Sequence, residues 1–91
     1  MQKCLIVEEF NEWEFATEHE PQDHVMKELG DLCYVLYQYA ANEGWNLDEI
    51  MDRIHYSNMS KLDKDGNPIF RSDGKILKGP NYQPPDLTDL V

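Results

Sequence analysis

Positive charge is scarce in this sequence, and this scarcity excludes some classes of partner. Eight lysines and arginines stand against 18 aspartates and glutamates, which gives a net charge of −10. Such an acidic chain is repelled by nucleic-acid phosphates and by anionic membrane surfaces, so we expect neither as a partner. Residues 1–52 hold only two of the bases (net −11), whereas residues 53–91 hold six (net +1). The C-terminal part therefore carries most of the groups that could contact phosphate.

Cysteines are few, and long apolar runs are missing. Cys4 and Cys33 do not form the CxxC pair of a zinc site, so we interpret them as small buried hydrophobic residues of a reduced compartment. No apolar run is long enough to span a bilayer, and the N-terminus lacks the pattern of a signal peptide. The sequence therefore predicts a cytoplasmic protein without a membrane partner.

The small size limits the hydrophobic core. With 91 residues, of which 41% are hydrophobic, the chain is expected to form a single domain over residues 1–91. A domain of this size buries only a modest share of its surface. Three short helices cannot cover both faces of the central one, so we expect a homodimer or a homotetramer with a shared helical core.

The spacing of apolar residues predicts three helices, at 3–16, 24–43 and about 47–59. We expect Asp23 to be the N-cap of the second helix and Gly44 to end it in the left-handed conformation. Asn46, followed three residues later by glutamate, predicts a capping box at the start of the third helix. The apolar side of the first helix should comprise Leu5, Ile6, Phe10, Trp13 and Phe15.

The chain changes character after residue 61. Short apolar segments at 69–71 and 75–77 flank the turn sequence Ser72-Asp73-Gly74 and predict a small β-hairpin. A glycine–proline pair and a proline–proline pair further along the chain predict an extended tail. The apolar residues of this tail favour its wrapping onto another surface. The fold class is therefore all-α, with a helical part at 1–61 and a hairpin and tail at 62–91.

Two acidic pairs suggest a metal site. Glu9 with Glu12, and Glu28 with Asp31, are each three residues apart and so share a helix face. Two such helices side by side would bring four carboxylates together, which is costly unless a hard cation such as Mg²⁺ joins them. The competing interpretation is a solvated acidic face, the usual role of such spacing. The second pair flanks an apolar stripe, so both interpretations stay open; the stripe comprises Val25, Leu29, Leu32, Leu36 and Ala40.

Gly30 lies between the two acids of the second pair, inside an expected helix, where glycine costs up to about 1 kcal/mol relative to alanine. Clearance for a ligand, or a packing notch for a neighbouring backbone, would explain a glycine there.

The order of these acids resembles a known motif. Glu8-Glu9-x-x-Glu12, 15 intervening residues and Glu28-x-x-Asp31 resemble the motif of the all-α nucleoside triphosphate pyrophosphohydrolases, the MazG-like superfamily. The C-terminal half resembles the phosphoribosyl-ATP pyrophosphohydrolase-like branch found in phages and bacteria. The segments that carry this second resemblance are Ser57-Asn58-Met59-Ser60-Lys61, residues 73–82 and Pro85-Asp86-Leu87. Together the resemblance covers roughly residues 4–87.

The resemblance implies roles for individual residues. The implied ligands of Mg²⁺, with Mn²⁺ as an alternative, are Glu9, Glu12, Glu28 and Asp31. Glu8 is implied to assist catalysis beside Glu9, by helping or orienting a water molecule. The implied contacts to phosphate or sugar are Asn58, Lys61, Lys75 and Lys78.

The implied activity is hydrolysis between the α and β phosphates of a (deoxy)nucleoside triphosphate or related nucleotide, with release of pyrophosphate. The alternative is a non-catalytic oligomerisation or nucleotide-binding module that retains the acidic site. Family members usually have a further helix before the Glu-Glu-x-x-Glu helix, and this sequence does not contain it. We therefore expect either a reduced form of the domain or a second subunit that supplies the missing face.

Overall fold

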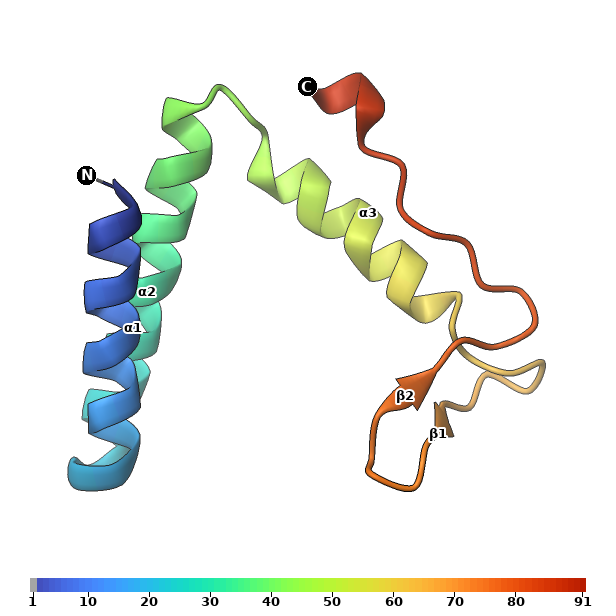
Figure 1. Ribbon diagram of the computed structural model, residues 1–91, viewed down its shortest axis with the longest axis horizontal. Coiled ribbons are helices and arrows are strands. Elements are labelled where there is room, and N and C mark those ends of the chain that lie inside the picture. Colours follow the sequence, from blue (N-terminus) through green and yellow to red (C-terminus); the bar gives the residue numbers. More distant parts are fainter. Residues whose placement is uncertain (1) are drawn as a thin grey trace. The chain divides into compact units, whose positions relative to one another are not determined.

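A computed structural model of the chain describes residues 2–91, which form two compact units that meet in the sequence at Trp45 and Asn46 (Figure 1). The first unit is a pair of helices, and the second contains a third helix, a hairpin and the tail. All three predicted helices, the hairpin and the extended tail are confirmed. The organisation as a single domain stays a prediction, as does oligomerisation.

The first unit consists of α1 (Gln2–His19) and α2 (Gln22–Asn42), which lie side by side and antiparallel (Figure 1). Their connection is short, and Pro21 in extended conformation (φ −63°, ψ 160°) precedes α2. The prediction that Asp23 is the N-cap is wrong. Pro21 occupies the N-cap position, and no side chain forms a capping hydrogen bond there. The Pro21 carbonyl accepts hydrogen bonds from the next turn, and Asp23 lies within that turn, where a negative charge suits the helix dipole.

The end of α2 follows the prediction. Gly44 has φ +78°, in the left-handed region that favours glycine. The Gly44 amide donates to the Ala41 carbonyl (3.1 Å) and the Trp45 amide to the Ala40 carbonyl (2.9 Å). This pair of bonds is the Schellman arrangement, and it satisfies carbonyls that the end of the helix would otherwise leave unpaired.

The packing seam of the first unit includes two acidic residues. Side chains spaced by three or four residues are the less exposed ones on each helix; they include Ile6, Glu9, Trp13 and Ala16 on α1, and Val25, Glu28, Leu32 and Val35 on α2. This is the spacing of the contact stripe between paired helices. Glu9 and Glu28 therefore occupy positions where an apolar residue would ordinarily pack.

Large apolar side chains remain exposed. On α1, the predicted core residues Leu5, Phe10 and Phe15 are 45%, 43% and 58% exposed. They lie on faces that α2 does not cover, because a single neighbouring helix can bury only one stripe. Cys4 and Cys33 are also exposed, which corrects the prediction that they are buried. Among residues 2–91, only Ala16 and Ala40 are buried hydrophobic residues.

The second unit begins with α3 (Leu47–Met59). Its N-cap is Asn46, whose Oδ1 accepts a hydrogen bond from the Glu49 amide (3.1 Å), as predicted. Strands β1 (Ile69–Phe70) and β2 (Ile76–Leu77) form the antiparallel hairpin, with Ile69 opposite Leu77. A short 3₁₀ helix, η1 (Thr88–Leu90), follows the extended tail.

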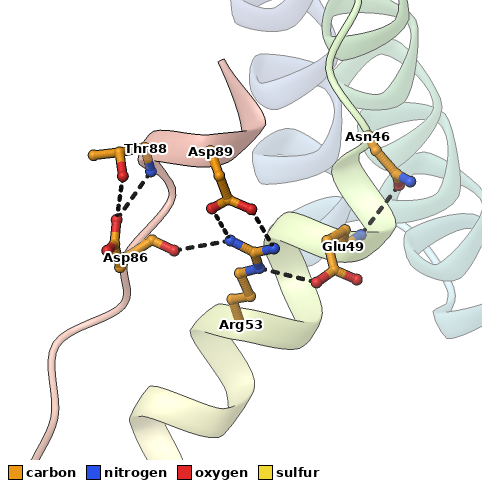
Figure 2. Close-up of polar contacts among 6 residues, drawn as sticks. All are labelled: Asn46, Glu49, Arg53, Asp86, Thr88 and Asp89. Carbon is orange, nitrogen blue, oxygen red and sulfur yellow. Dashed lines mark hydrogen bonds and ion pairs between the residues drawn. The ribbon is translucent and has the colours of Figure 1, made fainter.

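Arg53 of α3 holds the end of the tail. Figure 2 shows the Arg53 guanidinium donating to both carboxylate oxygens of Asp89 and to the Asp86 carbonyl, while its Nε donates to Glu49 Oε1. The two parallel bonds to Asp89 match the fork of the guanidinium. These contacts raise the pKa of Arg53 and lower that of Asp89. The tail therefore wraps onto α3, as its apolar residues predicted.

Candidate metal centre and phosphate-binding residues

An acidic cluster lies between the two helices of the first unit. It comprises Glu9 from α1 and Glu28 and Asp31 from α2, and one carboxylate oxygen of each lies within 4.8 Å of the others. The spacing of three residues puts Glu28 and Asp31 on one face of α2. Glu9 reaches the same place because it lies in the packing seam of α1. The structure thus brings together three of the four predicted metal ligands.

Two oxygens of this cluster are buried without a hydrogen-bond partner, Glu9 Oε2 and Glu28 Oε2. The Glu28 side chain is only 17% exposed, against 40% for Asp31. A buried carboxylate oxygen without a partner is destabilising unless a donor or a cation satisfies it. Converging carboxylates are the donor set that hard divalent cations such as Mg²⁺ take in proteins. The residues present therefore fit a divalent metal.

The electrostatics of Glu9 agree with this fit. Burial raises the pKa of Glu9, and the negative charges of Glu12, Asp31 and Glu28 raise it further. A side-chain hydrogen bond with Glu12 acts in the same direction. A neighbouring cation would have the opposite effect, because it favours the ionised carboxylate. The site thus has excess negative charge when only protein groups are counted.

Lys27 partly neutralises that charge. Its Nζ lies 2.7 Å from Asp31 Oδ2, one helical turn further on, and 3.7 Å from Glu28 Oε1. The hydrogen bond and charge of Asp31, followed by the charge of Glu28, raise the pKa of Lys27. We did not predict this contact from the sequence, although a lysine four residues before an aspartate is a sufficient signal on a helix.

The fourth predicted ligand, Glu12, and the predicted catalytic acid Glu8 line a hollow beside the cluster. Its volume is about 340 Å³, and its lining residues are Glu8, Asn11, Glu12, Phe15, Glu20 and Glu28. Both Glu8 and Glu12 are exposed to solvent. Asn11 and Phe15 were not predicted, but they follow Glu8 at helical spacing and so share its side of α1.

Gly30 has open space around it. A Cβ atom built on Gly30 would meet no heavy atom within 4 Å. The structure therefore contains no close backbone neighbour that requires glycine, and the packing-notch interpretation is wrong for residues 2–91. Clearance for a ligand stays a prediction.

Three of the predicted phosphate contacts meet in the second unit. Lys61 at the end of α3 and Lys75 and Lys78 of the hairpin line one hollow of about 530 Å³, together with Ile76 and Leu77. Lys78 Nζ also lies 4.9 Å from the centre of the Tyr82 ring. Lysines separated by up to 17 residues in sequence thus form one positively charged surface.

This convergence depends on Gly79. A Cβ atom at Gly79 would lie 2.4 Å from the Leu62 carbonyl oxygen and 2.5 Å from that of Lys61. Only glycine permits the hairpin to approach the chain after α3 so closely. The glycine of the Lys-Gly-Pro-Asn-Tyr segment therefore has a positional role beside Lys61 and Lys78.

The serines of the Ser-Asn-Met-Ser-Lys segment hold the tail. Ser57 Oγ donates to the Gln83 carbonyl (2.8 Å), and Ser60 Oγ accepts from the Gln83 amide (2.9 Å). The predicted site residue Asn58 is exposed and does not line the lysine hollow. Ser57 and Ser60 of this segment therefore hold the tail beside α3.

Comparison with protein families identifies the family of the chain. The model described as phosphoribosyl-ATP pyrophosphohydrolase (PRA-PH) matches residues 2–58, more than half of the chain. The chain belongs to the phosphoribosyl-ATP pyrophosphohydrolase family. This family is part of the MazG-like nucleotide pyrophosphohydrolase superfamily, so the predicted family is confirmed. No curated protein matches the chain.

The family are hydrolases of phosphoric anhydride bonds, so the chain is a nucleotide pyrophosphohydrolase in the general sense. The matched residues 2–58 include all five predicted acids and Asn58, but they end before Lys61 and the hairpin lysines. None of the helices among residues 2–91 is both long enough and apolar enough for a membrane crossing.

Proposed function

We propose that the chain is a Mg²⁺-dependent enzyme that cleaves between the α and β phosphates of a (deoxy)nucleoside triphosphate or related nucleotide and releases pyrophosphate. Mn²⁺ is the expected substitute for Mg²⁺. One observation carries the proposal: ligand oxygens of Glu9, Glu28 and Asp31 lie within 4.8 Å of one another, and two oxygens of the cluster are buried without a partner. Such a cluster is unfavourable without a cation.

In this proposal, Glu9, Glu28 and Asp31 hold the metal from two helices, and Glu12 joins them from the edge of the hollow. A bound divalent cation supplies neutralisation of phosphate oxygens and activation of a water molecule. Glu8 is exposed in the same hollow, where it can orient that water or accept its proton. These assignments keep Glu8 and Glu9 as the catalytic acids.

The proposal keeps Lys61, Lys75 and Lys78 as contacts to phosphate, with Asn58 as a polar contact. Its support is the hollow that the three lysines share. A nucleotide polyphosphate brings several negative charges, and the lysine ammonium serves phosphate as a compact point charge. Of the eight bases of the chain, these three are therefore well grouped for an anionic ligand.

We also propose a homodimer or homotetramer. The exposed large apolar side chains of α1 and α2 support this assembly, since their burial between subunits would be favourable. Neighbouring subunits would cover exposed apolar side chains such as Leu5 and Phe10.

The test is pyrophosphate release from a panel of ribo- and deoxynucleoside triphosphates and phosphoribosyl-ATP, with Mg²⁺ or with EDTA. We expect at least one substrate to yield equimolar pyrophosphate and monophosphate in Mg²⁺ and none in EDTA. Asp31→Asn should remove the activity. Glu14→Gln, which removes a charge from the same helix pair outside the cluster, should retain it. Release that persists in EDTA would contradict metal dependence, and no release from any substrate would favour the non-catalytic module.

A further inference from the structure

Lys27 contacts the acidic cluster, and the proposed function gives it no role. The first unit, up to Trp45, contains ten acids and only two bases, Lys3 and Lys27. Of these two, Lys27 contacts two of the proposed metal ligands, at 2.7 Å from Asp31 Oδ2 and 3.7 Å from Glu28 Oε1. Its ammonium therefore lies where a divalent cation on these carboxylates would repel it.

The mobility of this side chain permits a second position. The Lys27 side chain is 67% exposed, and its four-carbon stem is flexible. An exposed ion pair of this kind contributes little to stability, so breaking it is inexpensive. Once the Lys27 ammonium has left the carboxylates, a phosphate held by a cation on the cluster would offer it anionic oxygens within reach.

We propose that Lys27 exchanges partners: it neutralises Glu28 and Asp31 in the metal-free protein and contacts phosphate in the loaded protein. This inference rests on the proposed function, because it takes the cluster as the metal site. It adds one phosphate-binding residue to the acidic unit, which otherwise offers almost no positive charge to an anionic substrate. It also implies that Lys27 weakens metal binding and strengthens phosphate binding.

The experiment compares Lys27→Met with the wild-type chain in two titrations. The first measures Mn²⁺ affinity without nucleotide, by electron paramagnetic resonance. Removing the competing ammonium should tighten binding by about three- to tenfold, the effect of one nearby charge reduced by solvent and salt. The second measures the affinity of inorganic pyrophosphate for the Mn²⁺-saturated chain, and this should weaken by about tenfold, the loss of one charged hydrogen bond.

Two control variants separate local from general effects. Lys3→Met removes the same charge from the first unit away from the cluster, and it should change both affinities by less than about twofold because solvent and salt screen distant charges. Lys27→Arg keeps a positive charge at the site, and it should keep Mn²⁺ affinity near that of the wild type. Equal effects of Lys3→Met and Lys27→Met would show a net-charge effect and overturn the exchange.

The outcomes distinguish this inference from the proposed function. Tighter Mn²⁺ binding together with weaker pyrophosphate binding in Lys27→Met supports the exchange. Weaker or unchanged Mn²⁺ binding shows that Lys27 orients the ligands or is indifferent to them, and unchanged pyrophosphate binding shows that it makes no phosphate contact; either result overturns the exchange alone. Absence of Mn²⁺ binding by the wild-type chain overturns both the exchange and the proposed metal site.

Discussion

The two units of the chain use charge in opposite ways. In the first unit, Glu9, Glu28 and Asp31 converge with too little positive charge to balance them, and two of their oxygens have no partner. In the second unit, Arg53 satisfies both oxygens of Asp89 and also binds Glu49 (Figure 2). The contrast separates acids that hold the tail in place from acids whose charge the described protein groups leave largely unbalanced, and we propose that a cation balances the latter.

Replacing an acid of the cluster should have the largest effect on activity. Glu9→Gln should lower kcat/KM by about 100-fold or more, because a metal ligand is lost. The same change should raise the stability of the metal-free chain, because it removes a buried charge that its neighbours repel. Turnover and chemical denaturation in EDTA measure the two effects. A variant that is both active and destabilised would assign Glu9 to packing.

The lysines of the second unit should affect substrate use without affecting the metal. Lys61→Ala should weaken kcat/KM by about 1.5–3 kcal/mol, the range for a hydrogen bond to a charged group. Mn²⁺ affinity measured without nucleotide should stay at the wild-type value. Lys64→Ala, an exposed lysine outside the lysine hollow, is the matched control and should change neither quantity. If Lys61→Ala leaves kcat/KM untouched, Lys75 and Lys78 are the next residues to replace.

Gly79, which permits the close approach of the hairpin to the end of α3, should matter for stability. In Gly79→Ala the new methyl group would lie 2.4 Å from a backbone oxygen, so the hairpin must move away from the end of α3. We expect a loss of about 1–3 kcal/mol, as for other cases of overpacking, and faster proteolysis of the hairpin. Gly30→Ala, where the added atom meets nothing within 4 Å, is the control and should not destabilise the chain. Equal stability of both variants would show that the position of the hairpin does not depend on glycine at residue 79.

The pH dependence should differ in sign between the units. The raised pKa of Glu9 means that its folded carboxyl holds a proton more readily than the unfolded one. Its contribution to stability is therefore complete below its ordinary pKa near 4.5 and is lost as pH rises through the raised value. The lowered pKa of Asp89 gives the reverse: its contribution is present above about pH 3.8 and is lost as pH falls.

Residue-specific hydrogen exchange in EDTA would measure this difference, with α1 and α2 losing protection as pH rises and the tail losing it as pH falls, after correction for intrinsic exchange. Glu9→Gln should abolish the first trend and Asp89→Asn the second. A trend of the same sign in both units would contradict the contrast.

Regular local patterns made much of the fold predictable. The Asn46 cap, the Gly44 helix end and the hairpin all follow from short-range stereochemistry, and each is confirmed. The acidic cluster was also predictable, because spacing by three residues fixes which side chains share a helix face. What the pattern could not give was the choice of packing face on α1: its apolar residues surround the helix, so periodicity alone did not show that Glu9 lies in the seam and Phe10 outside it.

The remaining features depend on contacts between distant residues. The Arg53–Asp89 pair joins residues 36 positions apart, and no local pattern specifies it. Asp23 failed as an N-cap because Pro21 already sets the entry to α2. Cys4 and Cys33 failed as core residues because their helix faces have no neighbour among residues 2–91 that covers them.

A Mn²⁺ titration of the nucleotide-free chain tests the proposal that the Glu9, Glu28 and Asp31 cluster holds the catalytic metal. Electron paramagnetic resonance should show saturable binding in the wild type and in Glu14→Gln, and a loss of affinity of about 10- to 100-fold or more in Glu28→Gln. Helicity should be the same in all three proteins. Equal Mn²⁺ affinity in Glu28→Gln and the wild type would show that the cluster does not hold the metal.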